Sequence, residues 1–530
     1  MAKSDQQLTL LILGTASIQS YIFGSNRLKE NIGASYLVKQ VTEEWAVNAL
    51  KRVAPRANTD ENPNQKIEEG DLDAEVLYAG GGNFVVLFRE EETAKHFVET
   101  LSKKVLIDAP GLRLDVDQCQ FLWEVSGTGL GKAVGNLIKN QKKNRSLRRA
   151  SAPLLGLGVT AVCQSTGLPA TKIISDSDGK RRVSAEVAAK NAAAEKANKS
   201  LHNVLPLDEG YVYPSDLDQL GRTVGEQSYI AIVHADGNGM GEIIRQIGEI
   251  ENNRLYIEEM RKYSKQVTHI SKNAMLAVIK RLIQATVEDD KIAGVGPVAD
   301  LKFSVDEHRG LRLPIRPIVF GGDDTTFVCD GRLGLSLAAM YLREFENAAK
   351  QLGRNFSASA GVAIIKSRYP FARAYELSEE LCSEAKKFRY KDGKPEEVGG
   401  TLDWYFTSGG LYDELEEMRK REYTAKSGSL TLRPVTLGNE GGVRSWGTVK
   451  RLTSAFQNEW KDKRNKAKAL RDALREGPEA VQRFLKVYEQ ELPELAGFSA
   501  TGWNKIENAS TCGYFDALEL MDIYIPLDDE

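Results

Sequence analysis

The chain has 530 residues, 42% of them hydrophobic, which is too long for a single hydrophobic core. Its 71 basic and 74 acidic residues give a formal net charge of −3, which excludes nucleic-acid binding through a general basic excess. The five cysteines form no C-x-x-C pair, and no apolar run is long enough to span a membrane. The sequence therefore predicts a cytoplasmic protein without a disulfide framework or a membrane partner.

The N-terminal part of the chain predicts one β-α-β-β-α-β unit, the order that is typical of a ferredoxin-like fold. Its hairpin is marked by two apolar runs that flank Gly80-Gly81-Gly82-Asn83. The expected elements are a strand over 8–13, a helix from about Ile18 toward Leu50, the hairpin over 75–88, a helix over 91–106, a strand over 111–124 and a helix over 186–201.

The same order is predicted a second time further along the chain. This copy also has a glycine-rich hairpin, around Gly321-Gly322-Asp323-Asp324. The expected elements are strands over 229–235, 313–320, 325–329, 357–365 and 402–406, and helices over 241–288, 333–352 and 370–388. The chain is thus expected to hold two copies of one unit, at 1–210 and 211–425.

The remaining residues, 426–530, predict a helical C-terminal domain. Helices are expected over 450–477, 478–490 and 509–525, the first two of them highly charged. The predicted fold class is therefore α+β, with two ferredoxin-like (βαββαβ) domains followed by a helical domain.

The Gly-Gly-Asp-Asp turn of the second hairpin is the strongest candidate for chemistry. Asp323 and Asp324 are adjacent acids that repel each other, and a cation would relieve this repulsion. Gly321 and Gly322 allow a tight turn and the close approach of a ligand. The alternative is a surface β-turn, since glycine and aspartate are common turn residues.

A third acid, Asp236, ends the first strand of the same unit. In a ferredoxin-like sheet this strand lies beside the hairpin, so Asp236 is expected to lie within reach of Asp323 and Asp324. Three converging carboxylates predict a site for two divalent ions, Mg²⁺ or Mn²⁺, that catalyses phosphoryl displacement. The backbone of Gly237, Asn238 and Gly239 precedes a helix and is expected to bind phosphates, together with Gly321 and Gly322.

Other charged and polar residues predict weaker contributions. Lys386, near the end of the helix over 370–388, could reach a triphosphate or could be a solvated helix end. His234 lies beside the site, but a histidine within a strand is more often structural. The first hairpin carries no acids, so metal chemistry is not expected there. The basic run Lys139–Arg149 is a candidate contact for RNA or a triphosphate.

These residues resemble the large Palm-domain subunit of type III CRISPR effector complexes and, more distantly, the GGDEF nucleotide cyclases. Members often begin with an HD nuclease domain, whereas this sequence begins at the first Palm and resembles an HD-less member. The resemblance runs over most of the chain and is carried by Ile18–Phe23, Leu28–Leu37, Ala235–Gly241, Phe320–Thr325, Ser359–Val362, Ala385-Lys386 and Leu402–Trp404.

The resemblance implies two Palm domains, of which the second is active. In that family the active Palm converts ATP into cyclic oligoadenylate second messengers for antiviral defence when target RNA is sensed. Carried over by motif, Asp236, Asp323 and Asp324 would be the catalytic and metal positions, and Lys386 would be the phosphate-binding lysine. The implied partners are ATP or another NTP, an activating RNA and other CRISPR effector subunits.

Two other functions remain open from the sequence. One is an RNA-binding scaffold subunit of a type III effector complex with little or no catalysis, which the basic run Lys139–Arg149 and the acid-free first hairpin favour. The other is a template-dependent polymerase, against which the sequence offers the absence of a broad basic pattern.

Overall fold

The computed structural model of the protein forms two compact units. Unit 1 holds residues 1–206, 239–271 and 321–323, and unit 2 holds residues 207–238, 272–320 and 324–530. The chain thus passes between the units several times, unlike the three contiguous domains predicted at 1–210, 211–425 and 426–530. The described residues are 6–60, 62, 64–123, 129–147, 158–176, 179–220, 229–287, 290–391, 394–395, 399–407, 414–438, 441–506 and 509–527.

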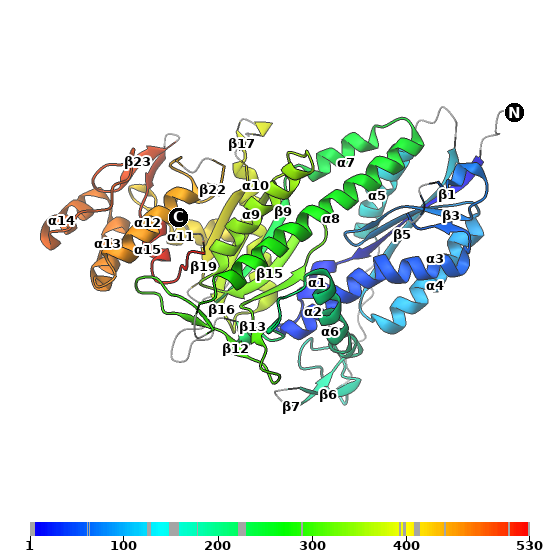
Figure 1. Ribbon diagram of the computed structural model, residues 1–530, viewed down its shortest axis with the longest axis horizontal. Coiled ribbons are helices and arrows are strands. Elements are labelled where there is room, and N and C mark those ends of the chain that lie inside the picture. The colour runs from blue at the N-terminus through cyan, green and yellow to red at the C-terminus, as the bar shows by residue number, and fades with distance from the viewer. Residues whose placement is uncertain are drawn as a thin grey trace. The chain divides into compact units, whose positions relative to one another are not determined.

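Unit 1 is built on a five-stranded sheet in the order β2-β3-β4-β1-β5 (Figure 1). β1 pairs antiparallel with β4 and with β5, and β3 pairs antiparallel with β4, which confirms the predicted ferredoxin-like arrangement. Gly81 and Gly82 make the hairpin turn with φ values of 58° and 76°, which glycine adopts without strain. The strands are β1 (Gln6–Ala16), β2 (Ala57–Asn58), β3 (Ala74–Gly80), β4 (Asn83–Phe88) and β5 (Arg113–Trp123).

The helix predicted from Ile18 toward Leu50 is interrupted. Ser25 Oγ accepts a hydrogen bond from the Arg27 backbone N–H at 3.1 Å and donates to Glu30 at 2.6 Å, so local side-chain bonds replace the helical ones. The helices are α1 (Ile18–Phe23), α2 (Leu28–Gln40), a π-helical turn (Val41–Trp45), α3 (Ala46–Val53), a 3₁₀ turn (Ile67–Glu69), α4 (Glu91–Asp108), α5 (Leu130–Leu147), α6 (Ala185–Val204) and α7 (Met240–Gly248). A separate hairpin of β6 (Lys172–Asp176) and β7 (Gly179–Val183) lies against α6 (Figure 1).

The long helix α8 (Asn253–Gln284) contributes its first half to unit 1 and its second half to unit 2. Tyr256 and Met260 of the first half belong to the apolar core on one face of the first sheet. Arg254 forms ion pairs with Glu75, whose side chain is completely buried, at 2.7 Å. The single helix predicted over 241–288 is thus two helices, and the first half of α8 is fastened to unit 1 by packing and by buried charge.

Unit 2 is built on a six-stranded sheet in the order β14-β15-β9-β16-β19-β22. Its first four strands repeat the antiparallel order of unit 1, which confirms the predicted duplication, and β19 then adds in parallel to β16. The strands are β9 (Tyr229–Gly237), β14 (Ile315–Val319), β15 (Asp324–Asp330), β16 (Ala358–Lys366), β19 (Thr401–Phe406) and β22 (Val435–Thr436), and the main helices on the sheet are α9 (Gly334–Gln351) and α10 (Phe371–Phe388).

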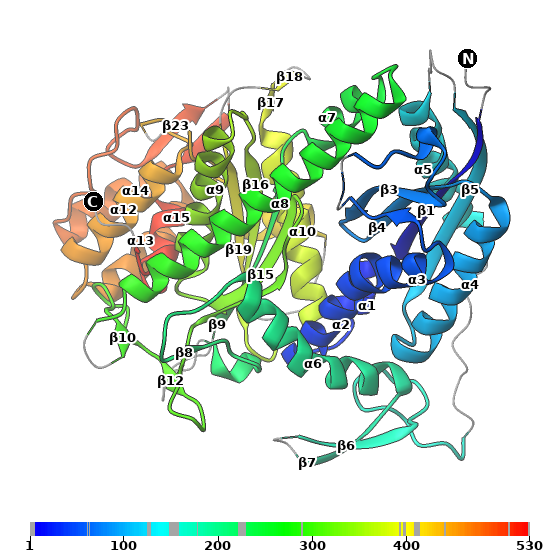
Figure 2. The ribbon, with the colours of Figure 1, turned by 45° about the vertical axis from the view of Figure 1, so that its right-hand side comes forward.

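The two helices α9 and α10 cover opposite faces of this sheet. A Cβ atom on Gly361 of β16 would lie 2.1 Å from the Ser378 carbonyl oxygen of α10. A Cβ atom on Gly334 of α9 would lie 3.3 Å from Val362, the next residue of the same strand. Because successive strand residues point to opposite faces, α9 and α10 lie on opposite sides, as Figure 2 shows.

The sequence predicts a helical domain over 426–530, but this part of unit 2 also contains strands. The helix predicted over 509–525 is wrong in its first part, because residues Ala509–Cys512 pair antiparallel with Trp503–Ile506 and a helix begins only after Gly513. The helix predicted over 450–477 is likewise two helices. The elements here are α11 (Leu415–Glu422), β20 (Thr424–Ala425), β21 (Gly428–Ser429), α12 (Trp446–Glu459), α13 (Arg464–Glu476), α14 (Pro478–Tyr488), β23 (Trp503–Ile506), β24 (Ala509–Cys512) and α15 (Phe515–Leu520).

Several short elements complete unit 2. They are β8 (Tyr211–Val212), a 3₁₀ turn (Leu217–Gln219), β10 (Lys291–Ile292), β11 (Leu301–Lys302), β12 (Ser304–Val305), β13 (Leu311–Arg312), β17 (Tyr390–Lys391) and β18 (Lys394–Pro395). Across the part of the chain that the structure describes, no helix combines the length and the apolar composition needed to cross a membrane.

Candidate functional site

Two of the predicted acids, Asp236 and Asp324, lie directly opposite each other on neighbouring antiparallel strands. Asp324 is the first residue of β15 and Asp236 is the last but one of β9, so both carboxylates stand at the same edge of the second sheet. The side chain of Asp324 is 46% exposed and that of Asp236 is 36% exposed, which leaves carboxylate oxygen atoms accessible to solvent. The two-residue alternation of β9 directs Asp236 to the same face as His234, whose ring contacts Tyr375 of α10.

Lys386, in the last turn of α10, lies on the Asp236 carboxylate. Its Nζ donates to Asp236 Oδ2 at 2.6 Å and to the Gly237 carbonyl oxygen at 3.0 Å. Because α10 packs on the face toward which Asp236 points, the lysine needs no extended loop to reach it. The structure thus brings Asp236, Asp324, Gly237 and Lys386 together within unit 2.

His234 lies beneath the pair of acids. Its Nδ1 is 3.2 Å from Thr326 Oγ1 and 3.4 Å from Asp324 Oδ1, and its side chain is nearly buried. Burial lowers the pKa of this imidazole below its ordinary value of 6.5, although the charges of Asp236 and Glu379 act in the opposite direction. The ring thus contacts Thr326 and lies close to the Asp324 carboxylate, and the structural role that its strand position indicates stays a prediction.

Asn238 turns its side chain into the protein. The residue is 8% exposed, and its amide group lies 3.1 Å from Ser357 Oγ and 2.8 Å from Ser359 Oγ. Its backbone N–H donates to the Ser357 carbonyl oxygen at 2.8 Å. The side-chain amide and the backbone N–H of Asn238 thus both bond within the protein. The role of this residue in phosphate binding stays a prediction from sequence.

The other predicted site residues, Gly239, Gly321, Gly322 and Asp323, belong to unit 1. Gly239 and Gly321 adopt positive φ angles of 71° and 114°, which favour glycine. A Cβ atom on Gly239, Gly321 or Gly322 would meet no described atom within 4 Å, so these glycines border open space. Burial raises the pKa of Tyr263, and the charge of Asp323 raises it further.

The donor chemistry at this edge of the sheet suits a hard divalent cation. Asp236 and Asp324 supply carboxylate oxygens, the ligands that Mg²⁺ and Mn²⁺ prefer. The Lys386 ammonium already occupies a cation position on Asp236. Among the described residues, no group of three or more His, Cys, Asp and Glu side chains is arranged to hold a metal ion. Two carboxylates of the kind that divalent ions use thus stand together here, and a metal site completed by Asp323 stays a prediction.

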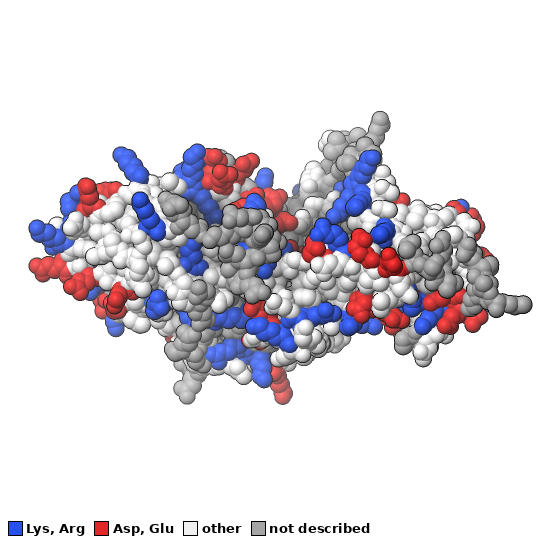
Figure 3. Space-filling model, turned by 90° about the horizontal axis from the view of Figure 1, so that it is seen from above, with Lys and Arg blue, Asp and Glu red and all other residues white. Residues whose placement is uncertain are grey.

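The corresponding edge of the first sheet has a different chemistry. Gly14 of β1 pairs with Asn83 of β4, so no acid stands where unit 2 has Asp236 and Asp324. Nearby, Arg145 forms an ion pair with Asp115, which neutralises one member of the basic run Lys139–Arg149. Residues 148 and 149 of that run lie outside the described residues. Figure 3 shows basic and acidic side chains interspersed on both the left and the right part of one face.

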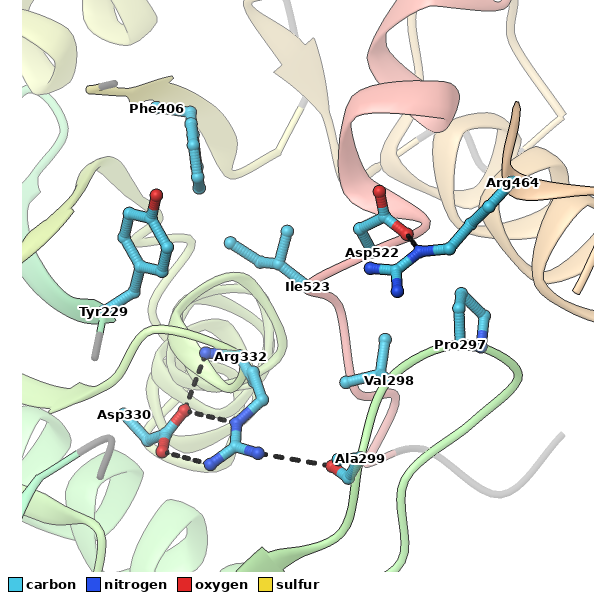
Figure 4. Close-up of a pocket in the computed structure, with 10 residues that line it drawn as sticks. All are labelled: Tyr229, Pro297, Val298, Ala299, Asp330, Arg332, Phe406, Arg464, Asp522 and Ile523. Carbon is cyan, nitrogen blue, oxygen red and sulfur yellow. Dashed lines mark hydrogen bonds and ion pairs between the residues drawn. The ribbon is translucent and has the colours of Figure 1, made fainter. Parts of the chain in front are cut away.

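Figure 4 shows a cavity of about 440 Å³ in unit 2. It lies at the end of the second sheet opposite the acids, because β9 begins at the cavity and reaches Asp236 at its other end. It is lined by the first residue of β9, Tyr229, and by the last residue of β19, Phe406. Its two guanidinium groups are matched by carboxylates, Arg332 by Asp330 at 2.8 Å and Arg464 by Asp522 at 2.8 Å. The cavity therefore offers little net charge to an anionic ligand, and the accessible acids lie elsewhere.

The fold and the opposed acids define a Palm-type protein. Residues 229–394 match the protein family described as Cas10/Cmr2, second palm domain, so this part of the chain is similar to that Palm domain. The matched segment contains β9, β15 and α10, and with them Asp236, Asp324 and Lys386.

Solved structures share the fold over nearly the whole chain. A Csm1–Csm4 cassette in complex with AMPPNP has a TM-score of 0.52 at 14% identity, covering 99% of this chain and 70% of that one. The cassette in complex with pppApApA has a TM-score of 0.56 at 13% identity, with 98% and 70% covered. Csm1 from T. onnurineus has a TM-score of 0.50 at 15% identity, with the same coverage. No curated protein matches the sequence.

Sequence reasoning missed the polar residues beneath the acids. Ser357 directly precedes β16, Ser359 lies on β16 and Thr401 begins β19, and these residues contact Asn238 or each other. A lone serine or threonine in an apolar strand gives no pattern that points to a site. They become visible only when strand pairing places Ser359 beside Asp236 and Thr401 beside Ser359.

Proposed function

We propose that the protein is the Palm subunit of a type III CRISPR effector complex and that its second Palm joins ATP into cyclic oligoadenylates. The observation that carries the proposal is the accessible pair Asp236–Asp324, with Lys386 beside it, inside the segment that matches the Cas10/Cmr2 family. Support also comes from structures of similar fold whose ligands are AMPPNP, pppApApA and cA4.

In the proposed reaction a ribose hydroxyl of one nucleotide attacks the α-phosphorus of the next. A phosphodiester bond forms, pyrophosphate leaves and the hydroxyl proton passes to solvent. Asp236 and Asp324, with Asp323 from the adjacent position, would hold Mg²⁺ or Mn²⁺, which would supply charge neutralisation and an activated hydroxyl. Lys386 would bind the triphosphate, and His234, whose Nδ1 lies 3.4 Å from Asp324 Oδ1, would help to keep Asp324 in place.

The proposed partners follow from the same comparisons. ATP is proposed as the substrate, and a Csm4-like subunit is proposed as a partner because the similar Csm1 chains were solved in a Csm1–Csm4 cassette. An activating RNA is proposed as the trigger. A purely scaffolding role would require that the accessible acids and the lysine on them have no substrate, and no described contact favours that alternative.

The purified protein is expected to convert ATP, in the presence of Mn²⁺ or Mg²⁺, into cyclic oligoadenylates that mass spectrometry detects. The assay is run with each of the four NTPs, alone and with candidate target RNA bound to a co-expressed effector complex. Asp323→Ala combined with Asp324→Ala is expected to abolish the product, because it removes two of the three proposed metal ligands. Product that survives this double substitution would refute the site.

Lys386→Met is expected to affect metal and nucleotide in opposite directions. An ammonium group and a divalent ion compete for the same Asp236 oxygens, so its removal should tighten Mn²⁺ binding to the nucleotide-free protein about threefold or more. Loss of the triphosphate contact should raise KM for ATP about tenfold. Electron paramagnetic resonance measures the first quantity and steady-state kinetics the second. Weakened Mn²⁺ binding in Lys386→Met would contradict the proposal that Lys386 competes with a metal ion for Asp236. The matched control is Lys387→Met, because Lys387 pairs with Glu384 rather than with a site residue.

A further inference from the structure

A row of polar side chains runs straight across the second sheet. Asp324 pairs with Asp236, Asp236 with Ser359, and Ser359 with Thr401, on four neighbouring strands. The two acids at one end are accessible, whereas Ser359 and Thr401 are completely buried. A buried polar group without a hydrogen-bond partner is destabilising, so the buried half of the row has to satisfy its hydrogen bonds internally.

The buried half of the row forms a continuous chain of contacts. The Asn238 amide lies 2.8 Å from Ser359 Oγ, which lies 2.7 Å from Thr401 Oγ1. Thr401 Oγ1 in turn donates to the carbonyl oxygen of Ala385 at 2.8 Å. Asn238 follows Asp236 by two residues, and Ala385 directly precedes Lys386. This series of hydrogen bonds therefore begins beside Asp236 and ends beside Lys386.

Proton counting gives this chain a direction. If the Asn238 amide presents its oxygen to Ser359, the two hydroxyl protons of Ser359 and Thr401 have to serve three contacts. If the amide presents its nitrogen, every contact has one proton, because oxygen and nitrogen of an amide exchange places by a half turn. Asn238 then donates to Ser359, Ser359 to Thr401 and Thr401 to Ala385. In the structure Asn238 Nδ2 lies 3.1 Å from Ser357 Oγ and Oδ1 faces Ser359, so this arrangement turns the amide by half a turn and makes its oxygen the acceptor from Ser357.

We infer that Asn238, Ser359 and Thr401 form a one-directional hydrogen-bond relay that fixes Asp236 and Lys386 relative to each other. This role deepens the proposed function, on which it rests for its purpose. The relay joins two elements that are far apart in the sequence, the end of β9 and the last turn of α10, where it ends on the Ala385 carbonyl oxygen. Ser359 and Thr401 are completely buried, so within the relay they act as positioning residues. Asparagine suits the first place because its side chain, unlike a carboxylate, donates a proton.

The relay is tested by two substitutions of one residue. Thr401→Val keeps the shape of the side chain and removes its hydroxyl, whereas Thr401→Ser keeps the hydroxyl and removes a methyl group. Loss of one buried hydrogen bond lowers local stability by about 1 kcal/mol, which corresponds to about fivefold faster exchange. Hydrogen exchange of the full chain, followed by mass spectrometry, should therefore be about fivefold faster in Thr401→Val at the end of β9 and in the last turn of α10. In Thr401→Ser it should match the natural protein.

Mn²⁺ binding to the full chain provides a second readout. Thr401→Val and Ser359→Ala are expected to weaken it about fivefold, and Thr401→Ser should stay within about twofold of the natural protein. Thr453→Val is the matched control, since Thr453 is also fully buried and its hydroxyl also donates to a backbone carbonyl, that of Val449, at 2.8 Å. This control is expected to lower the melting temperature without changing Mn²⁺ affinity or exchange at the two segments.

Faster exchange in Thr401→Ser than in Thr401→Val would overturn the relay, because it would show that the methyl group matters and the hydroxyl does not. Unchanged exchange in both Thr401→Val and Ser359→Ala would overturn it as well. The exchange readout needs neither metal nor ATP. A natural protein that makes no oligoadenylate would therefore refute the proposed function alone, and exchange that ignores Thr401 would refute the relay alone.

Discussion

Asp236→Asn is expected to lower the formation of oligoadenylates at least about 100-fold while leaving the fold intact. Asparagine keeps the shape of the side chain but loses the charge that would hold a divalent ion opposite Asp324. The ion pair between Asp236 and Lys386 is partly exposed, so its contribution to stability is only about 0–1 kcal/mol. Product yield by mass spectrometry and melting temperature by calorimetry should therefore respond very differently.

Asp522→Asn is the matched control for this experiment. Asp522 is also a partly exposed carboxylate of unit 2, with 30% of its side chain accessible, and it pairs with Arg464 at 2.8 Å. It lines the cavity at the opposite end of the sheet, away from Asp236 (Figure 4). Its substitution should leave product formation within about twofold of the natural protein. Equal losses in the two variants would show that neither carboxylate is specific to the reaction.

Gly361→Ala is expected to destabilise unit 2 by about 3 kcal/mol or more. The new methyl group would lie 2.1 Å from the Ser378 carbonyl oxygen and 2.4 Å from the Cys382 backbone nitrogen of α10. Helix backbone cannot yield as a flexible side chain does, so α10 would have to move away from β16. Because α10 carries Lys386, the displacement should also weaken the contact with Asp236. A melting temperature lowered by roughly 5–10 °C in calorimetry would agree with this expectation.

Gly135→Ala controls for the effect of alanine itself. Gly135 lies within α5 of unit 1, and a Cβ atom there would meet no described atom within 4 Å. Alanine in an open helical position should raise stability by about 0.5–1 kcal/mol. If Gly361→Ala behaved like Gly135→Ala, the close packing of α10 on β16 would be wrong.

Local patterns in the sequence were sufficient to predict both ferredoxin-like sheets. Alternating and continuous apolar runs define strands within a few residues, and Gly81 and Gly82 of the first hairpin and Gly321 of the second adopt backbone angles that few other residues adopt. The pairing of Asp236 with Asp324 followed from this topology, because the first strand lies beside the hairpin in such a sheet. These predictions rest on interactions between neighbours in the chain or within one supersecondary unit.

Where the patterns were interrupted or ambiguous, the sequence was a poorer guide. Ala509–Cys512 has a composition that a helix tolerates, and only its partner strand Trp503–Ile506 makes it a strand. The break after α1 depends on a buried serine that bonds to Glu30. Both outcomes depend on contacts that a pattern of single residues does not contain.

The sequence by itself determined which acids could form a site, because carboxylates at a strand end and at a glycine turn are recognisable wherever the strands go. Only the tertiary structure decided what surrounds them. It placed α10 on the face of Asp236, which put Lys386 on that carboxylate, and it aligned Ser359 and Thr401 with Asp236 across three strands. These relations depend on which helix packs on which face and on strand register, and both are set by the packing of the whole unit rather than by any local run of residues.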